Sequence, residues 1–562
     1  MQSPRISKQS FEDDEADEED ALLDTEKCQV KKDLGRAYAA HPFIQGHFLG
    51  GLAESFGMKL LIMLFATQHL MKGFANSFVG PPTQYLLAAY KVDGPRLGIF
   101  GGVVSLPWAM KPIIGLISDC FPVAGYNKGP YILFVSLLGV TATLLVGIMP
   151  HDTIGVEKVV ACLFIIQLQL STSDLLSEAK YAEKMQKKPE KGPELMTYVW
   201  FGLTAGSLVA TLLIGPCIAH FGVKASYILV AVPLAVVMVP VSLNYMEEKQ
   251  RSTEEIAAAR QHMLAQKEAC ILCLLMFVST VVLAILGTVY ESIELNAAVA
   301  VFVGLVMAVS FTLVLKPLIA KVNLFFLLQT ACSLNIGGAT FYFYTDTMEQ
   351  YPEGPHFTME FYTSVLGVTG SLCSMAGVYT YQKYMTKWSY RSLLLAANVA
   401  LSVLSFADVV MLSRLNVRMG VPDRAFVLGA SVFQTLIAQW MWMPGVVLNS
   451  QLCPKGMEAT MYALLAGCHN LGFTIASSCG ALLLKWLNCA PRGQPGESAD
   501  FMNLWKASAL STVLPLFTLV MLPWMIPDAY QTEKLLDEDD RDATSGSLWK
   551  RWWGEKSAHL SL

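Results

Sequence analysis

Apolar runs long enough to cross a bilayer, separated by short polar breaks, fill most of this chain. A membrane-spanning helix needs about 20 mostly apolar residues. Reading the breaks predicts fourteen membrane helices, with bounds uncertain by about two to four residues. They are 57–79, 95–117, 131–149, 157–178, 196–218, 224–244, 270–290, 293–315, 321–345, 358–383, 390–413, 425–449, 457–485 and 505–526. The break "YESIELN" at 290–296 is the least distinct, and a re-entrant pair is the alternative there.

Composition supports an all-α polytopic membrane protein. Of the 562 residues, 54% are hydrophobic and only 15% are charged, against about 25% charged in soluble domains. The net charge of -5 and the lack of basic blocks interleaved with aromatics argue against nucleic-acid binding. The twelve cysteines are scattered. Cys270 and Cys273 form a C-x-x-C that opens an apolar run, so we expect small buried residues rather than a redox pair.

Basic residues in the loops predict the orientation. With the N-terminus in the cytoplasm, sixteen Lys and Arg fall in cytoplasmic loops and eight in outer loops, as the positive-inside rule requires. The acidic start, "FEDDEADEED", is unlike a signal peptide. Both termini are therefore expected in the cytoplasm, and we expect the plasma membrane as the membrane of residence.

Charge and hydropathy divide the chain into six parts. These are an acidic disordered tail (1–56), a first six-helix bundle (57–245), a polar linker predicted as an amphipathic helix (246–268), two additional helices (269–316), a second six-helix bundle (317–527) and a cytoplasmic tail (528–562). Two six-helix bundles are the outline of a major-facilitator-type fold, which places its substrate site between them at the bilayer midplane. We therefore expect twelve core helices and two extra ones.

The stretch "PWAMKPIIGLISDCFPVAGYNKGPY" (107–131) places charges at the end of the second predicted helix. Lys111 can extend its long side chain to the interface, and Asp119 lies about two turns further on. Gly115 permits close approach of another helix. A carboxylate here can pair with a cation in one conformation and release it in another, so we predict a gate. The alternative is a static topology anchor.

Polar side chains within the predicted helices mark a transport pathway, because charges at the bilayer centre are costly. His69 and Lys72 are three apart and are expected to share a face. There Lys72 could hold a substrate carboxylate, or it could simply reach water. Asp174 and Glu178 are four apart on one face, which suggests proton coupling. Alternatively, Glu178 pairs with Lys180 or Lys184 at the cytoplasmic end.

Later helices carry further candidates. Asp408 is isolated in its helix and is a second candidate proton site. Gln434 and Gln439 offer amides that can recognise a heterocycle edge, and Pro444 is expected to break their helix. Asn470 is a further pathway candidate. Glu458 is either a pathway residue or a helix cap.

Aromatic residues gather where the ninth predicted helix ends. Phe341, Tyr342, Phe343 and Tyr344 could stack on a flat ring or form an interfacial aromatic belt. Asp346 follows them and is a candidate gate residue.

Three segments resemble the folate–biopterin transporter family of the major facilitator superfamily. They are "PWAMKPIIGLISD" with "GYNKGPY", "SDLLSEAKYAEKM" (173–185) and "LCPKGMEATMYALLAGCHNLG" (452–472), and "FYFYTD" (341–346) adds to the likeness. Gly115 and Asp119 fit the superfamily motif between the second and third helices. That motif continues with paired basic residues, where this chain has Asn127 and Lys128.

The resemblance implies a secondary active importer of folate or pterins that works by alternating access. Titratable carboxylates within helices favour protons as the coupling ion. Alternatives are transport of S-adenosylmethionine or another small metabolite, and a receptor that binds a pterin without moving it. The chain carries no hydrolase, metalloprotease or phosphate-loop motif, so we expect no enzyme, no cofactor and no metal. We expect a monomer in the bilayer.

Overall fold

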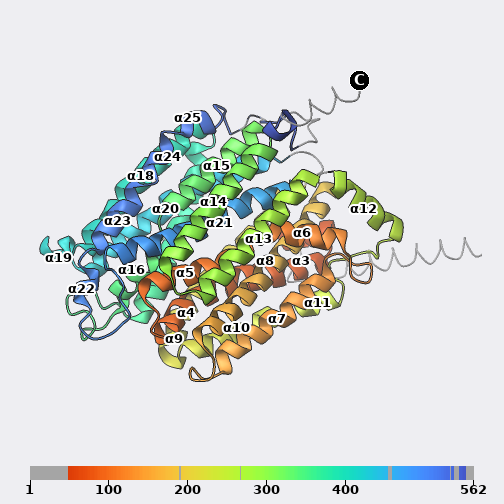
Figure 1. Cartoon of the computed structure of the whole chain (residues 1–562). Helices are drawn as coiled ribbons and strands as arrows, with labels where there is room; N and C mark the ends of the chain where they lie inside the picture. The colour runs from red at the N-terminus through yellow and green to blue at the C-terminus, as the bar shows by residue number, and fades with distance from the viewer. Residues whose placement is uncertain are drawn as a thin grey trace, which may run out of the picture.

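The helices form two bundles with two further helices between them. The computed structural model describes residues 48–188, 191–265, 267–453, 458–531, 533, 535–536 and 543–551. The acidic N-terminal tail up to residue 47 lies outside these residues. In Figure 1 the red-to-yellow helices gather on one side and the cyan-to-blue helices on the other, with green α13 and α14 between them.

The first bundle follows the first six apolar runs. Its elements are α2 (Phe48–Phe56), α3 (Met58–Leu64), η1 (Phe65–Ala75), α4 (Asn76–Ala89), α5 (Gly94–Ser105), η2 (Leu106–Trp108), α6 (Lys111–Cys120), α7 (Gly129–Ile148), α8 (Val156–Lys187), α9 (Gly192–Phe221), α10 (Val223–Val236) and α11 (Met238–Ser242). The first membrane helix is continuous through α3, η1 and α4. It bends by 110° at Gly57, where α2 precedes it. Residues 48–56 are therefore helical, whereas the sequence placed them in the disordered tail.

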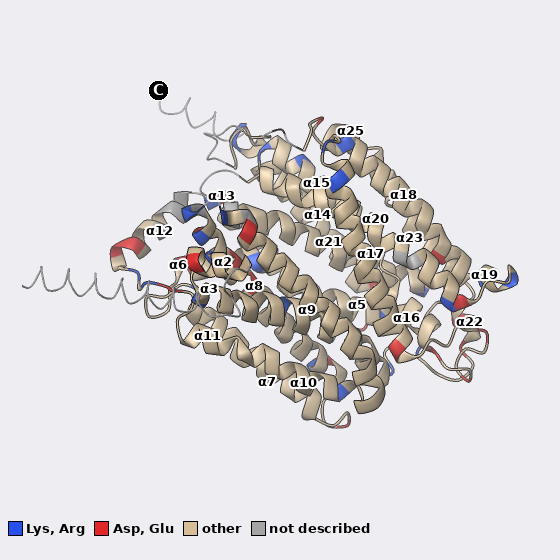
Figure 2. Ribbon diagram, turned by 180° about the vertical axis from the view of Figure 1, so that it is seen from behind, with Lys and Arg blue, Asp and Glu red and all other residues tan. Residues whose placement is uncertain are grey.

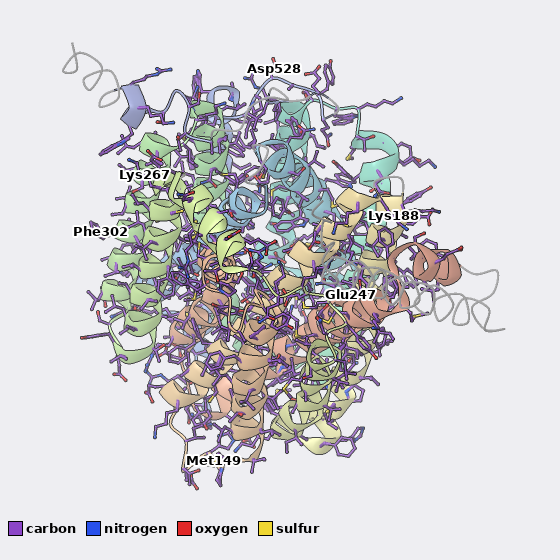
Figure 3. The ribbon with its side chains drawn as sticks, turned by 90° about the vertical axis from the view of Figure 1, so that its right-hand side faces the viewer. Met149, Lys188, Glu247, Lys267, Phe302 and Asp528 are labelled. Carbon is purple, nitrogen blue, oxygen red and sulfur yellow. The ribbon has the colours of Figure 1, made fainter. Side chains whose placement is uncertain are left out.

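The linker and the two extra helices follow. The linker helix is α12 (Thr253–Ala265), and the extra pair is α13 (Lys267–Val289) and α14 (Ile293–Val314). Both members of the pair are long and apolar enough to cross a membrane, so "YESIELN" is a turn between two full spans. The side chain of Phe302 on α14 is 65% exposed and projects away from the molecule (Figure 3), as expected of a lipid-facing position.

The second bundle contains the remaining spans. Its elements are α15 (Pro317–Cys332), α16 (Gly337–Thr345), η4 (Glu360–Val365), α17 (Leu366–Thr380), η5 (Tyr381–Met385), α18 (Tyr390–Leu412), α19 (Leu415–Arg418), α20 (Asp423–Gln451), α21 (Glu458–Trp486), α22 (Ser498–Phe501), α23 (Leu504–Val513), α24 (Leu516–Leu519) and α25 (Leu522–Met525). Among the described residues, eleven helices pass a length and hydropathy test for spanning a membrane, and the bent first helix makes twelve. The two other predicted spans are occupied by α21 and by the series α23 to α25.

Two helix breaks differ from the prediction. Pro444 lies inside α20, which continues unbroken to Gln451; a proline in a membrane helix is tolerated where neighbouring groups satisfy the freed carbonyl. The break lies instead between α15 and α16, at residues 333–336. The predicted span 321–345 is thus a discontinuous helix.

The molecule has two ends, which we name the α12 end and the α22 end after the helices that lie there (Figure 1). Lys and Arg, and Asp and Glu, lie mainly toward these ends, while the helix surfaces between them are largely uncharged (Figure 2). This is the distribution expected of a protein whose middle faces lipid.

The two bundles are joined near the α22 end. Gly94 N–H donates to Pro491 O at 2.9 Å, and the Tyr342 hydroxyl donates to Val92 O. The Ser364 hydroxyl donates to Thr211 O at 2.6 Å. Backbone approach is so close here that a Cβ on Gly338 would lie 1.9 Å from Gly94 O. Small residues thus allow tight packing of α5 against α16.

Candidate functional site

Two prolines place Lys111 at a helix start in the interior. Pro107 lies in the short helix η2, and Pro112 is in the first turn of α6, so a new helix begins between them. Lys111 is the first residue of α6, a position that is electrostatically unfavourable for a cation because the helix N-terminus is positive. A carboxylate must therefore compensate for this charge.

That carboxylate is Asp174 of α8. Its side chain is fully buried, and Oδ2 lies 2.6 Å from Lys111 Nζ. Its other oxygen, Oδ1, lies 2.8 Å from Lys72 Nζ, and Lys72 belongs to the π-helical segment η1. Asp174 thus bridges lysines from two different helices.

Glu178, one turn after Asp174, completes what we call the charge cluster: Lys72, Lys111, Asp174 and Glu178. Its carboxylate lies 3.1 Å from Lys72 Nζ and 3.6 Å from Lys111 Nζ. Two cations and two carboxylates give a formal charge of zero. The Glu178 side chain is 32% exposed, whereas that of Asp174 is inaccessible. Glu178 is therefore the carboxylate of the charge cluster that a proton or solute can reach, and its partners are not Lys180 or Lys184.

Neutral groups hold the cluster in place. Gln68 Nε2 donates to Asp174 Oδ1 at 3.0 Å and to Ser177 Oγ at 2.8 Å. The Lys111 ammonium lies 4.8 Å from the centre of the Trp108 ring, a cation–π distance. Each of these contacts restricts a charged side chain that would otherwise have several rotamers.

His69 lies outside the charge cluster, contrary to the shared face expected for His69 and Lys72. Its Nε2 is 3.1 Å from Tyr198 O of α9, and its ring packs on Gly202. The reason is the π-helical winding of η1, in which the wider turn rotates residues three apart away from each other. His69 therefore contributes to packing between η1 and α9.

The structure brings the four predicted gate residues together. Lys111, Gly115, Asp119 and Lys128 all line one small pocket of about 30 Å³ with Thr460 of α21, between the bundles. Lys111 belongs to the charge cluster as well. Gly115 lies beside Leu175, where an added Cβ would make only an ordinary contact at 3.6 Å. The backbone therefore does not require glycine there.

The linker supplies the positive charge that the α6–α7 loop lacks. Arg260 Nε donates to Cys120 O at 2.9 Å. Asn127 accepts from the Arg251 guanidinium at 2.8 and 3.2 Å when its amide oxygen faces that group. The Glu248 carboxylate accepts from the backbone N–H groups of Lys128 and Gly129, which begin α7. The linker therefore holds the loop from outside.

An aromatic-lined cavity of about 260 Å³, which we call the aromatic cavity, lies in the second bundle. Its lining comes from α15, α20 and α21: Phe326, Gln329, Thr330, Ser333, Met441, Trp442, Gly445, Val446, Asn449, Tyr462, Ala466, His469 and Asn470. Trp442 and His469 lie with their rings 5.3 Å apart. Among the described atoms, Asn449 Oδ1 is buried without a hydrogen-bond partner. Tyr462 lines this cavity and lies near Glu178 and Lys72 of the first bundle.

A second cavity, of about 450 Å³, surrounds Asp408, and we call it the Asp408 cavity. Gln434 Nε2 donates to Asp408 Oδ2 at 3.0 Å and lies 3.3 Å from Leu404 O. The two cavities share the lining residues Ser333 and Met441. The structure thus brings Asp408 and Gln434 together, on α18 and α20.

The remaining candidates have other surroundings. Gln439 packs against Gly377 of α17. The side chain of Glu458 lies outside the described residues. Phe341, Tyr342 and Phe343 are buried among other rings near the α22 end and form neither a belt nor a stacking platform. Asp346, only 4% exposed, lies beside them.

A family model described as the BT1 family matches residues 72–545. The chain belongs to the BT1 family. This region contains all the residues of the charge cluster and of both cavities.

Curated relatives of this BT1-family chain are similar over nearly its whole length. Probable folate-biopterin transporter 6 of Arabidopsis thaliana is 24% identical over 514 residues, covering 91% of each chain. The folate-biopterin transporter of Synechocystis sp. is 25% identical, covering 89% of this chain and 88% of the relative. Folate transporter 1 of Plasmodium falciparum is 22% identical, covering 89% and 84%. The expected family is confirmed, as is the expectation of a multi-pass membrane transporter rather than an enzyme.

Solved structures confirm the two-bundle fold. The peptide transporter POT in complex with sulfate matches with a TM-score of 0.58 at 14% identity, covering 84% of this chain and 96% of that one. A D-xylose-proton symporter matches with a TM-score of 0.55 at 12% identity, covering 85% and 100%. At these identities the likeness concerns the fold alone.

Proposed function

We propose that this BT1-family protein imports folate or related pteridines through a membrane by alternating access, driven by protons. The curated relatives named as folate or folate-biopterin transporters support the substrate class. Residues 57–245 and 317–527 are proposed as the two moving bundles. The protein works as a monomer in the plasma membrane.

The excess of basic residues in the loops at the α12 end supports a cytoplasmic position for that end. In that orientation the hydrogen bonds from Gly94, Tyr342 and Ser364 close the outer side. The structure then corresponds to a conformation closed to the outside. Import requires these contacts to separate when substrate enters and to form again before it is released.

The charge balance of the charge cluster is the observation that carries the proposal. With all four groups ionised, the two carboxylates of the charge cluster balance the positive charges of both lysines. Neither lysine is then left to pair with a substrate carboxylate. Protonation of Glu178 would leave two cations against one carboxylate, a net charge of plus one. A substrate carboxylate could then take the place that Glu178 vacates beside Lys72. One proton thus accompanies one bound carboxylate.

The aromatic cavity is proposed to hold the flat ring. Trp442 offers a surface for stacking. The amides of Gln329, Asn449 and Asn470 provide both donors and acceptors, and the unpartnered Asn449 Oδ1 would accept from a ring N–H. Tyr462 lines this cavity and lies near Glu178, which supports one folate molecule contacting both places.

Uptake in one expression host tests the proposal. Labelled folic acid, biopterin and S-adenosylmethionine are supplied at pH 5.5 and 7.5 to cells with and without the protein. We expect saturable uptake of a pteridine that is faster at the lower pH. Saturable uptake of S-adenosylmethionine alone would instead favour the cationic-metabolite alternative, and binding of a pterin without uptake would favour a receptor.

The variant Glu178→Gln isolates the proton step. A neutral amide mimics protonated Glu178, so folate binding should persist while its pH dependence disappears. Glu183→Gln is the matched control, because Glu183 lies on the same helix and pairs with Lys180 and Lys187 away from the charge cluster. An unchanged pH dependence in Glu178→Gln would remove Glu178 from the coupling role.

A further inference from the structure

Asp408 is a carboxylate within a membrane helix that lacks a cationic partner among the described residues. Its contacts are the Gln434 amide and the walls of the Asp408 cavity. The titratable neighbour from α16 is Tyr344, and α23 contributes only hydroxyls, from Ser508, Ser511 and Thr512. Since unpaired charges in membrane helices are costly, this carboxylate is neutralised either by a proton or by a counter-ion from outside the chain.

The walls of the cavity are rich in oxygen. Gln434 uses its amide N–H₂ on Asp408 and Leu404 O, so its own carbonyl oxygen is left to act as an acceptor. Ser402 and Ser405 lie on the same helix as Asp408. Carboxylate, amide and hydroxyl oxygens are the ligands that hard cations prefer.

The break between α15 and α16 borders the same cavity. Residues 333–336 interrupt the helix inside a membrane span, and all four line the Asp408 cavity. Discontinuous membrane helices expose backbone carbonyls and helix ends to ions. The side chain of Asn335 caps the next helix by accepting from Gly337 N–H at 2.9 Å. The break is therefore a built feature rather than a frayed end.

The size of the cavity also fits an ion with some of its water. One water occupies about 30 Å³ of liquid, so about 450 Å³ holds several. A carboxylate, neutral oxygen groups, a helix break and a cavity thus meet at one place in the second bundle.

We propose that the Asp408 cavity is a binding site for a small monovalent inorganic cation, sodium or hydronium, separate from the charge cluster. Asp408 supplies the charge, while Gln434 and the serine hydroxyls supply neutral ligands. The role of such an ion in import depends on the proposed function, but its binding does not.

Binding is measured on the purified full-length protein without substrate. Thermal stability is followed at fixed ionic strength while sodium chloride replaces the chloride salt of a large organic cation at pH 7.5, and separately while pH falls from 8 to 5. We expect wild type to gain several degrees in Tm along at least one of these series. Asp408→Asn should lose that gain, whereas the exposed-loop control Asp152→Asn should keep it.

The sodium series and the pH series distinguish the two cations. A sodium-dependent increase in Tm that weakens as pH falls identifies sodium competing with protons at Asp408. An increase in Tm as pH falls, without any response to sodium, identifies hydronium. The same response in wild type and Asp408→Asn would overturn the proposal, as would the absence of a response in both series. If folate uptake is absent but the Asp408-dependent shift is present, the proposed function fails while the cation site stands.

Discussion

Asp174 and Asp408 are both aspartates in the middle of membrane helices, yet their surroundings are opposite. Asp174 is fully buried, and two lysines lie within 2.8 Å of its oxygens. Asp408 borders a cavity, and its one side-chain partner is the neutral Gln434. The first bundle thus balances its charge within the chain, while the second leaves a charge to be balanced from outside. Because the partners of these two aspartates differ so much, a buried carboxylate indicates a function only when its partners are known.

Removing the carboxylate from the charge cluster should have the largest effect. Asp174→Asn leaves Lys72 and Lys111 close together beside only Glu178. Loss of one partner of a buried ion pair costs about 3–5 kcal/mol, so we expect both surface expression and uptake to fall by at least tenfold. The double variant Asp174→Asn with Lys72→Gln should recover expression, because it restores a formal charge of zero, but not transport. Normal expression of the single variant would contradict the charge-balance argument.

Removing one cation from the charge cluster should affect substrates unequally. Lys72→Gln withdraws the ammonium proposed to receive a substrate carboxylate. Folate uptake should fall by about tenfold or more, corresponding to about 1.4 kcal/mol or more of lost interaction, while biopterin uptake changes less. Kinetics for both substrates at equal surface expression give the ratio. Equal losses of uptake for the two substrates would show that Lys72 stabilises the bundle and does not bind the substrate carboxylate.

Neutralising the unpaired carboxylate should change stability in the opposite direction. Asp408→Asn removes an uncompensated charge while keeping the hydrogen-bonding shape, so without sodium at pH 8 the variant should be more stable by on the order of 1 kcal/mol. Thermal unfolding in detergent, beside wild type and Asp174→Asn, provides the comparison. A destabilised Asp408→Asn would imply a cationic partner for Asp408 within the chain.

A pH-dependent effect, on stability alone and not on transport, is expected at Asp346, outside the membrane spans. Burial, and then the nearby Glu497 carboxylate, raise the pKa of Asp346 from 3.8 to about 7, with Lys91 opposing the shift. His356 Nδ1 bonds its backbone oxygen at 2.7 Å. Because the folded protein holds this proton more tightly than the unfolded chain, stability should fall as pH rises from about 4 to 7 and then level off.

The Asp346→Asn variant should lack this slope. Its Tm relative to wild type should therefore increase between pH 4 and 7 and stay constant above that. Glu353→Gln is the control, because Glu353 is exposed in the same loop and pairs with Ser498. Parallel pH curves for Asp346→Asn and wild type would assign the slope to other groups.

The sequence predicted the helices well because apolar runs determine membrane spans almost alone. It also identified Lys72, Lys111, Asp174 and Glu178 individually, since charges are conspicuous in such runs. It did not predict their association, because Lys72 and Asp174 are about a hundred residues apart and pairing depends on bundle packing. His69 was misplaced because nothing in the local sequence reveals the π-helical winding of η1.

The second bundle shows what else was missed. The break at 333–336 does have a signal in the sequence, since Asn335 precedes the glycine pair Gly337 and Gly338. The sequence analysis instead predicted a break at Pro444. Trp442 and Asn449 were not selected, because an aromatic ring or an amide in a membrane helix has no distinctive spacing. Their significance comes from the cavity that three helices form around them.

Proton uptake on folate binding tests the central claim most directly. Purified protein in weakly buffered solution at pH 7.5 is mixed with a saturating amount of folate, and the released or absorbed protons are counted with a pH indicator. Our account predicts about one proton absorbed per folate bound by wild type, and none by Glu178→Gln. Folate binding to wild type with no proton absorbed would contradict it.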